Sequence, residues 1–289
     1  MAHAAPQWFL NSQIAGRFDD IHLLQPGSRF QVFDAHETTA NRRVAIKVPA
    51  DDSAAWLHDV LRHEAKVLAT IGSHPNIVTL YQHLELDDGR PALLLELCTG
   101  SLSDALAAGD TMSVQQTVAV GIKLAGALDT MHNAGYLHCD VRPSNILVTE
   151  WGEPALSGFD ESVLIDSRLG RAPMHVTTTH TAPELLQGEE PTARSDVYGL
   201  ASTLYELLAG RAAFREYAGE SPAAMVVRVL SGTVKPIFAP DVPLEVSDLL
   251  TWAMSPDPTE RPPGPSWLAE ELRRVERDQD WPRTRMLTG

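Results

Sequence analysis

The chain has 289 residues, of which 44% are hydrophobic and 21% charged; this composition excludes a disordered or fibrous protein, and the length favours two lobes or two small domains. The formal net charge of −15 opposes non-specific binding to nucleic acid, which needs clustered cations, so we expect a nucleotide or a protein as the partner. The apolar runs are far shorter than the roughly 20 residues that span a bilayer, and residues 1–11 lack a secretory signal pattern, so we expect a cytoplasmic protein without a membrane segment.

The first third of the chain alternates short apolar, β-branched runs with turn residues. This pattern predicts strands at residues 31–33, 44–48 and 77–80. Between the last two runs, Ser53 precedes a stretch with leucines at helical spacing, which ends at Gly72. We therefore expect a small sheet that carries one helix.

From Leu102 onward the apolar residues follow a helical period. The clearest predicted helices cover residues 114–133, 195–208 and 267–277, each bounded by Gly or Pro. Residues 96–100 lie between the strand-rich and the helix-rich parts, so we expect a hinge there, next to a ligand cleft.

These elements predict an α+β fold with a small β-rich lobe and a larger, mostly helical lobe. The polar tail contains Pro282, which is typical of a frayed chain end. The expected boundaries are an N-terminal extension at 1–13, the N-lobe at 14–95, the hinge at 96–100, the C-lobe at 101–278 and the tail at 279–289.

Several short motifs follow one another in a fixed order. They are Val44-Ala45-Ile46-Lys47, then Glu64, then His138-Cys139-Asp140 with Asn145, then Ala182-Pro183-Glu184. Each is weak alone, since a lysine on a strand is usually a solvated charge, but the order and spacing resemble a eukaryotic-like bacterial Ser/Thr protein kinase. The resemblance covers nearly the whole chain and implies a two-lobed protein kinase-like fold.

The resemblance implies an ATP site in the N-lobe. Lys47 matches the lysine that reaches the nucleotide phosphates, and Glu64 matches the carboxylate that holds it in place. Glu64 shares a helix face with leucines, where an unpaired carboxylate is costly, so we expect a Lys47–Glu64 ion pair rather than a surface charge. The other positions implied for nucleotide binding are Gly27, Val32, Ala45, Leu95, Glu96, Cys98 and Leu147.

The resemblance also implies a catalytic set, to which Lys47 belongs as well. Asp140 matches the carboxylate that accepts the substrate hydroxyl proton, and Asn145 matches an amide that binds magnesium. Arg142 stands where most Ser/Thr kinases place a lysine near the transferred phosphate. Thr177 matches a threonine beside the catalytic aspartate, which favours a Ser/Thr kinase over a Tyr kinase.

Further matches imply structural roles. Glu184 and Arg261 match an ion pair that braces the activation segment, and Asp196 matches an aspartate that supports the catalytic loop. Cys139 replaces an arginine that usually receives an activation-loop phosphate. Because Cys98 and Cys139 lack metal-ligand spacing, we expect free thiols and no zinc.

The phosphate-covering loop departs from the family pattern. Residues 25–30 keep only Gly27 of three glycines, and Phe30 puts a large ring where close approach to phosphate needs none. The ring either fills the nucleotide cleft or belongs to a tolerated variant of the loop.

The metal site departs as well. Counting from Asn145 places Gly158, and not Asp160, where the family has its magnesium-binding aspartate. On an extended segment Asp160 would point as Gly158 does but lie roughly 6.6 Å away, because each residue of a strand rises roughly 3.3 Å. We therefore expect magnesium to lose its main carboxylate, with Asn145 and Asp160 left as poor candidate ligands.

Two functions remain open, with a third ranked last. The first is a pseudokinase that binds a protein partner, with weak, metal-independent or absent ATP binding; the alternative is an active Ser/Thr protein kinase with non-standard metal coordination. A small-molecule phosphotransferase fits the Ala182-Pro183-Glu184 motif less well. Residues 121–128 and 152–156 are also similar to soluble bacterial regulator kinases.

Overall fold

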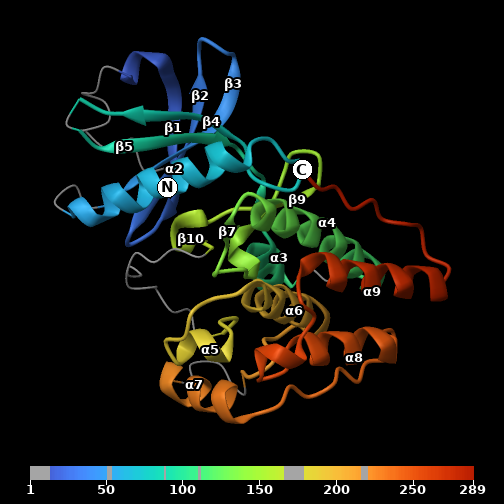
Figure 1. Cartoon of the computed structure of the whole chain (residues 1–289). Coiled ribbons are helices and arrows are strands. Elements are labelled where there is room, and N and C mark those ends of the chain that lie inside the picture. The colour runs from blue at the N-terminus through green and yellow to red at the C-terminus, as the bar shows by residue number, and fades with distance from the viewer. Residues whose placement is uncertain (1–13, 51–53, 88, 110–111, 166–178, 216–220) are drawn as a thin grey trace. The chain divides into compact units, whose positions relative to one another are not determined.

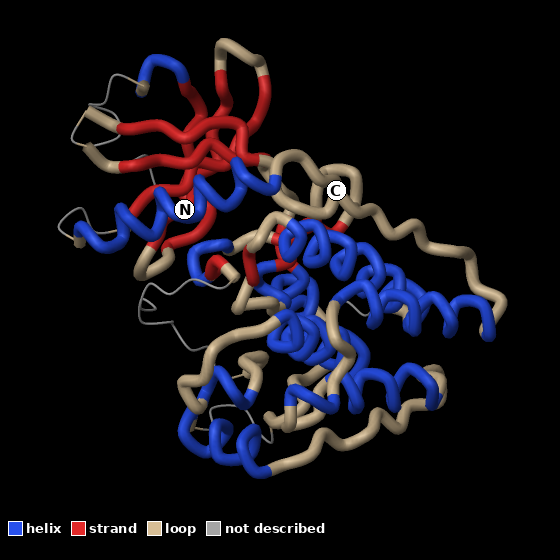
Figure 2. The backbone as a smooth tube through the Cα atoms, viewed as in Figure 1, coloured by secondary structure: helices blue, strands red, loops and turns tan. Residues whose placement is uncertain are grey.

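The computed structural model describes residues 14–50, 54–87, 89–109, 112–165, 179–215 and 221–289 (Figures 1 and 2). The chain divides into two compact units. Unit 1 comprises Met1–Ser73, Val78–Thr99 and Thr149–Trp151, and unit 2 comprises His74–Ile77, Gly100–Val148 and Gly152–Gly289. The expected extension at 1–13 and the side chain of Thr177 lie outside the described residues.

The described part of unit 1 is an antiparallel sheet in the strand order β1-β2-β3-β5-β4, with a long helix, α2, packed against it (Figure 1). Its elements are the 3₁₀ turn η1 (Ala15–Arg17), β1 (Phe18–Pro26), β2 (Phe30–Glu37), β3 (Arg42–Pro49), α2 (Ala55–Ile71), β4 (Leu80–Glu85) and β5 (Pro91–Glu96).

The two faces of this sheet have different roles because side chains alternate along a strand. On β3, Val44, Ile46 and Val48 enter an apolar cluster on one face of the sheet. Ala45 and Lys47 therefore face the other way. That second face is the one that can meet a side chain from α2.

Unit 2 is mostly helical, and its long helices pack side by side (Figures 1 and 2). Its helices are α3 (Leu102–Ala108), α4 (Val114–Asn133), α5 (Pro183–Leu186), α6 (Ala193–Ala209), α7 (Pro222–Ser231), α8 (Leu244–Ala253) and α9 (Pro265–Asp278). Short strands and 3₁₀ turns complete it: β6 (Gly100–Ser101), β7 (Tyr136–Leu137), η2 (Pro143–Asn145), β8 (Ile146–Val148), β9 (Pro154–Leu156), η3 (Phe159–Glu161), β10 (Val163–Leu164) and η4 (Pro258–Glu260).

Helix α4 forms the centre of unit 2 and packs against α6 and α9. A capping box between Ser113 and Gln116 starts the helix, because each side chain accepts a hydrogen bond from the other residue's backbone N–H. The observed bounds are those predicted from the helical period. Gly121 lies where a Cβ would collide with Leu204 and Leu272, so the helices of unit 2 approach closely at that point.

Two predictions about the elements of the fold are wrong. The strand expected at 77–80 is displaced: β4 begins only at Leu80, and Ile77 instead forms an isolated bridge with Leu156 in unit 2. The tail expected to be frayed makes hydrogen bonds, among them one from the Trp281 N–H to the Glu276 carbonyl at 2.8 Å.

Candidate functional site

Lys47 of β3 and Glu64 of α2 form an ion pair in unit 1. Lys47 Nζ lies 2.6 Å from Glu64 Oε2, and both side chains are almost fully buried. A buried carboxylate and a buried ammonium stabilise each other only with such close geometry. The ion pair expected from the sequence is therefore present.

Three of the other positions expected to bind nucleotide share the sheet face of Lys47. Val32 stands opposite Lys47 in the β2–β3 register, and Ala45 stands opposite Leu95 in the β3–β5 register. Because directly opposed residues point to the same face, these four side chains lie on one surface. The expected partner Leu147 lies in β8 of unit 2, opposite Ala155.

Glu96 and Cys98 lie where β5 ends. The Glu96 N–H donates to the Thr79 carbonyl at 2.9 Å, which fixes the end of the strand. Cys98 is a free, half-buried thiol. Burial, with a smaller contribution from the Glu96 charge, raises the pKa of Cys98 to about 12, so this thiol is a poor nucleophile at neutral pH.

The turn between β1 and β2 places an aromatic ring beside Lys47. Gly27 is needed in this turn, because a Cβ there would collide with the carbonyl oxygen of Phe30. Phe30 is 8% exposed, and its ring centroid lies 4.6 Å from Lys47 Nζ. The strand register explains this contact between Phe30 and Lys47. Phe30 lies two residues before Val32, so its side chain points to the same face of the sheet as Lys47.

Three of the catalytic residues expected from the sequence, Asp140, Asn145 and Arg142, meet in unit 2, whereas Lys47 lies in unit 1. Asn145 Nδ2 donates to the Asp140 carbonyl at 2.8 Å and to Asp140 Oδ2 at 2.7 Å. Arg142 Nε lies 3.0 Å from the same Oδ2, as an ion pair rather than an aligned hydrogen bond. One carboxylate oxygen of Asp140 is thus shared by an amide and a guanidinium.

Gly158 adopts the left-handed conformation, with φ 75° and ψ 52°. A Cβ at this position would lie 2.7 Å from both Cγ and Oδ1 of Asn145, so the asparagine amide fills the space that a side chain at 158 would take. A magnesium ion needs near-octahedral oxygen ligands. The Asn145 amide donates to Asp140 through Nδ2, so its Oδ1 stays a possible ligand, whereas Gly158 provides no side-chain oxygen. The residues present lack the carboxylate at position 158 that the family pattern provides for magnesium.

The expected position of Asp160 is wrong. The segment is not extended, because Phe159–Glu161 forms the 3₁₀ turn η3. With about three residues per turn, Asp160 points in a different direction from residue 158 rather than along it. Phe159 itself is fully buried and packs edge-on against His138, with ring centroids 5.1 Å apart.

Asp196 at the start of α6 holds the chain just before Asp140. It accepts hydrogen bonds from the backbone N–H groups of His138 and Cys139, each at 2.8 Å, and lies 2.8 Å from His132 Nε2. Burial alone would raise the pKa of Asp196, but the hydrogen bonds and charges of His132 and His138 hold the pKa below its usual value. His132 was missed in the sequence, where its place near the end of a helix gives no signal of this contact.

Glu184 and Arg261 form the expected brace. Two parallel contacts of 2.8 Å join the guanidinium to the carboxylate, and Ser195 Oγ donates to the same carboxylate at 2.7 Å. The Arg261 side chain is 0% exposed and also lies over the Tyr198 ring. This bidentate geometry ties the start of α5 to the segment before α9.

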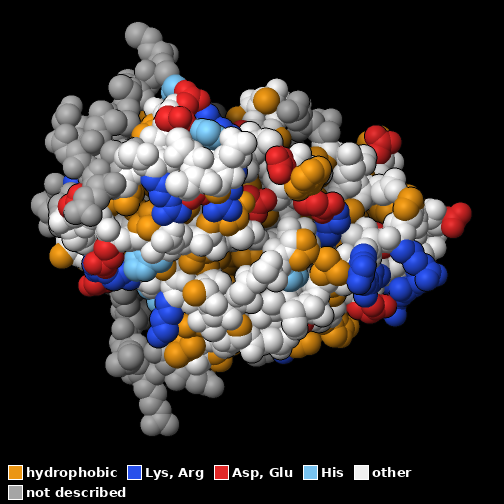
Figure 3. All heavy atoms as spheres, turned by 90° about the horizontal axis from the view of Figure 1, so that it is seen from above, with side chains coloured by type: hydrophobic (Ala, Val, Ile, Leu, Met, Phe, Trp, Pro, Cys, Tyr) orange, Lys and Arg blue, Asp and Glu red, His pale blue; other side chains and the backbone are white. Residues whose placement is uncertain are grey.

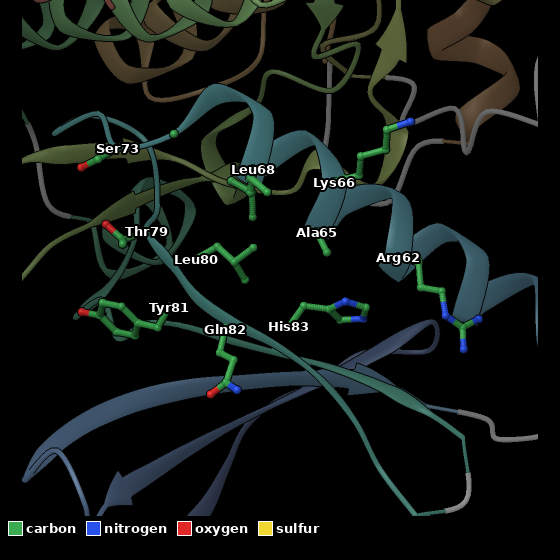
Figure 4. A pocket seen from close by; sticks show the side chains of 12 residues that line it. Arg62, Ala65, Lys66, Leu68, Ser73, Thr79, Leu80, Tyr81, Gln82 and His83 are labelled. Carbon is green, nitrogen blue, oxygen red and sulfur yellow. The ribbon is translucent and has the colours of Figure 1, made fainter.

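A separate pocket of about 570 Å³ lies within unit 1, between α2 and β4. Ala65 and Leu68 from the helix point toward Leu80 and His83 from the strand (Figure 4). Its lining includes none of the residues expected to bind nucleotide or metal.

Three surface and composition findings bear on ligand class. On the face drawn in Figure 3, Lys and Arg side chains are interspersed with Asp and Glu. Among the described residues, no group of three or more His, Cys, Asp or Glu side chains is placed to hold a metal ion. In the same part of the chain, every helix is too short or too polar to cross a bilayer.

Residues 18–272 match the protein kinase domain family. The Ser/Thr-protein kinase PknK of Mycobacterium tuberculosis (strain H37Rv) is 32% identical over 262 residues, which cover 90% of this chain and 24% of that protein. The Ser/Thr-protein kinase PkaB of Streptomyces coelicolor is 34% identical over 230 residues, or 75% of this chain and 54% of that protein. The chain therefore spans about a quarter of the length of PknK and about half that of PkaB.

Proposed function

The chain belongs to the protein kinase domain family, and on that premise we propose that it is a kinase domain that has lost magnesium-dependent phosphoryl transfer and acts as a protein-binding or allosteric regulatory module. The observation that carries the proposal is the metal position. Gly158 supplies no carboxylate, and the Asn145 amide fills the vacated space and donates to Asp140. Kinases depend on magnesium to bridge and neutralise the phosphates during transfer.

The nucleotide lysine supports the same proposal. Lys47 already has the Glu64 carboxylate at 2.6 Å and the Phe30 ring centroid at 4.6 Å. A phosphate that approaches this ammonium has to displace the ring or share the charge with it. We therefore propose ATP binding that is weak, independent of magnesium, or absent.

What the chain retains is the bracing of the fold. The Glu184–Arg261 pair is fully buried, and Asp196 holds the chain before the catalytic loop. Such contacts preserve shape whether or not phosphate is transferred, and a preserved shape is what a protein-binding module needs. In this proposal residues 96–100 form the hinge, the ligands are proteins, and a cytoplasmic location stays a prediction from the sequence.

A second candidate is an active Ser/Thr kinase with non-standard metal coordination. The observation that favours it is the intact Lys47–Glu64 pair together with Asp140 and Asn145 at hydrogen-bonding distance. These are the parts that an active site of this family uses to position ATP and the substrate hydroxyl.

One experiment separates the two candidates. The protein is incubated with γ-labelled ATP, a generic protein substrate and either Mg²⁺ or Mn²⁺, beside an Asp140→Asn control. We expect no label above the level of the control. Incorporation that disappears in Asp140→Asn protein would overturn the proposal and establish the second candidate. As a matched test in cells, Asp140→Asn protein should support the same phenotype as the unmodified protein.

A further inference from the structure

The tail, residues 279–289, turns back from α9 and runs toward α4 (Figure 1). Its first turn is fixed by Glu276, which is buried on α9. The Thr284 N–H donates to both carboxylate oxygens of Glu276, at 3.0 and 3.2 Å. A buried carboxylate that accepts backbone N–H groups holds that backbone firmly, because an unsatisfied buried charge is costly.

The far end of the tail lies on α4. The Gly289 N–H donates to Thr130 Oγ1 at 2.9 Å, and Thr130 Oγ1 donates in turn to the Gly126 carbonyl at 2.9 Å. The tail approaches α4 closely at Gly126. A Cβ there would collide with the Leu287 carbonyl oxygen and lie 3.1 Å from Met286 Cγ.

The three atoms nearest to that Cβ position all belong to the tail. Glycine in the middle of a helix is unfavourable relative to alanine, so a glycine at 126 weakens α4 by itself. The docked tail accounts for its presence. We call the surface of α4 around Gly126 and Thr130 the tail groove.

The tail also contacts the loop His74–Ile77. His74 is buried, and its Nε2 lies 3.0 Å from the Leu287 carbonyl oxygen. Because His74 Nδ1 accepts a hydrogen bond from the Asn76 N–H at 3.1 Å, the proton of the neutral ring is on Nε2, which donates to the tail.

That loop in turn holds β9. Asn76 Nδ2 donates to the Pro154 carbonyl at 2.8 Å, and the Leu156 N–H donates to the Asn76 carbonyl at 2.8 Å. Leu156 is two residues before Gly158. The contacts thus run without a gap from the tail through the loop to the strand that leads into the altered metal segment.

An ion pair joins the same parts by a second route. Lys123 Nζ on α4 lies 2.6 Å from Glu153 Oε2, immediately before β9. The two sequence runs 121–128 and 152–156, which are distant in the chain, therefore meet in unit 2. One of them carries Gly126, and the other carries the strand held by the loop.

We propose that the tail is a docking strap: the tail groove binds residues 281–289 in cis, and this docking positions His74–Ile77 and β9. Release of the strap exposes a surface that can bind an extended peptide segment, because the absence of a side chain at Gly126 lets a backbone carbonyl pack against the helix. It also loosens the strand before Gly158. The inference does not depend on whether the domain transfers phosphate.

A double-mutant cycle tests the strap. Gly126→Ala is made in the full chain and in a chain that ends at Asp280, and Tm is measured for all four proteins. In the full chain the added methyl group expels the Leu287 carbonyl and Tm should fall. In the shortened chain only the better helix propensity of alanine remains, and Tm should rise. The same change of Tm in both backgrounds would overturn the proposal.

A peptide with the sequence of residues 281–289 tests the groove directly. It should bind the shortened chain, should bind the full chain at least tenfold more weakly, and should fail to bind the shortened chain carrying Gly126→Ala. A scrambled peptide is the control. Equal binding to the full and the shortened chain, or none to either, would refute a groove that the tail occupies.

Hydrogen exchange tests whether the docked tail positions His74–Ile77 and β9. Amides of residues 74–77 and 154–156 should exchange faster in the shortened chain, while amides of α8 should not change. Unchanged exchange at 74–77 would contradict the positioning role. If the shortened chain does not fold, the full chain carrying Gly126→Ala serves for the same measurement, with the same expected result.

Discussion

Placing an aspartate at position 158 tests whether the missing carboxylate explains the proposed loss of magnesium binding. In Gly158→Asp the new Cβ would lie 2.7 Å from Cγ and Oδ1 of Asn145, so the amide has to leave its place. Loss of its hydrogen bond to the Asp140 carboxylate costs about 1.5–3 kcal/mol. A left-handed φ at a non-glycine residue adds roughly 1–2 kcal/mol. Without metal, the variant should therefore lose about 2.5–5 kcal/mol of stability.

The matched control is Gly158→Ala, which has the same Cβ and the same backbone strain but no carboxylate. Both variants should lose roughly 5–15 °C of Tm in EDTA. With Mg²⁺ and ATP, Gly158→Asp should recover part of the loss, because the carboxylate and the displaced Asn145 amide can both reach a metal ion. A magnesium response in the unmodified protein or in Gly158→Ala as large as that in Gly158→Asp, or an unchanged Tm in Gly158→Ala, would refute the reasoning.

Three further predictions follow from the described contacts. Removing the ring with Phe30→Ala should raise ATP affinity about 10- to 30-fold, because a desolvated cation–π contact with Lys47 is worth about 2 kcal/mol; isothermal titration measures it, and an unchanged affinity would argue against occlusion. Arg261→Gln should lower the free energy of unfolding by about 3–5 kcal/mol in urea titration, since it strands the buried Glu184 carboxylate, whereas a loss below about 1 kcal/mol would show a pair exposed to water. The pKa of Asp196 is depressed in the fold, so its contribution is present above the unfolded aspartate value of about 3.9 and is lost as pH falls below it. The unmodified protein should therefore lose more stability than Asp196→Asn between neutral pH and pH 3, and parallel pH profiles would contradict this.

Much of the fold could be predicted because local signals agree with it. The helix at 114–133 has both an apolar period and the Ser113–Gln116 capping box, so its bounds were found to the residue. The strand expected at 77–80 failed for a non-local reason. Ile77 is apolar and β-branched like a strand residue, but its bridging partner is Leu156, far along the chain. No pattern within the run carries that information.

Only part of the candidate site could be predicted from the sequence. The Lys47–Glu64 pair followed from the cost of burying a lone carboxylate on an apolar helix face. The contact of Phe30 with Lys47 needs the β2–β3 register, which turn chemistry alone does not supply. The place of Asp160 was wrong because a glycine with positive φ turns the chain there. The docking of the tail had no signal in sequence except a glycine at 126.

A thermal-shift titration with ATP, with and without Mg²⁺, tests the central claim most directly. A ligand that reaches 100 times its dissociation constant adds about 2.7 kcal/mol of stability, which is easily measured. We predict a small shift or none, the same with and without Mg²⁺, and no shift in Lys47→Ala protein. A shift that appears only with Mg²⁺, accompanied by turnover of ATP, would contradict the loss of metal-dependent chemistry.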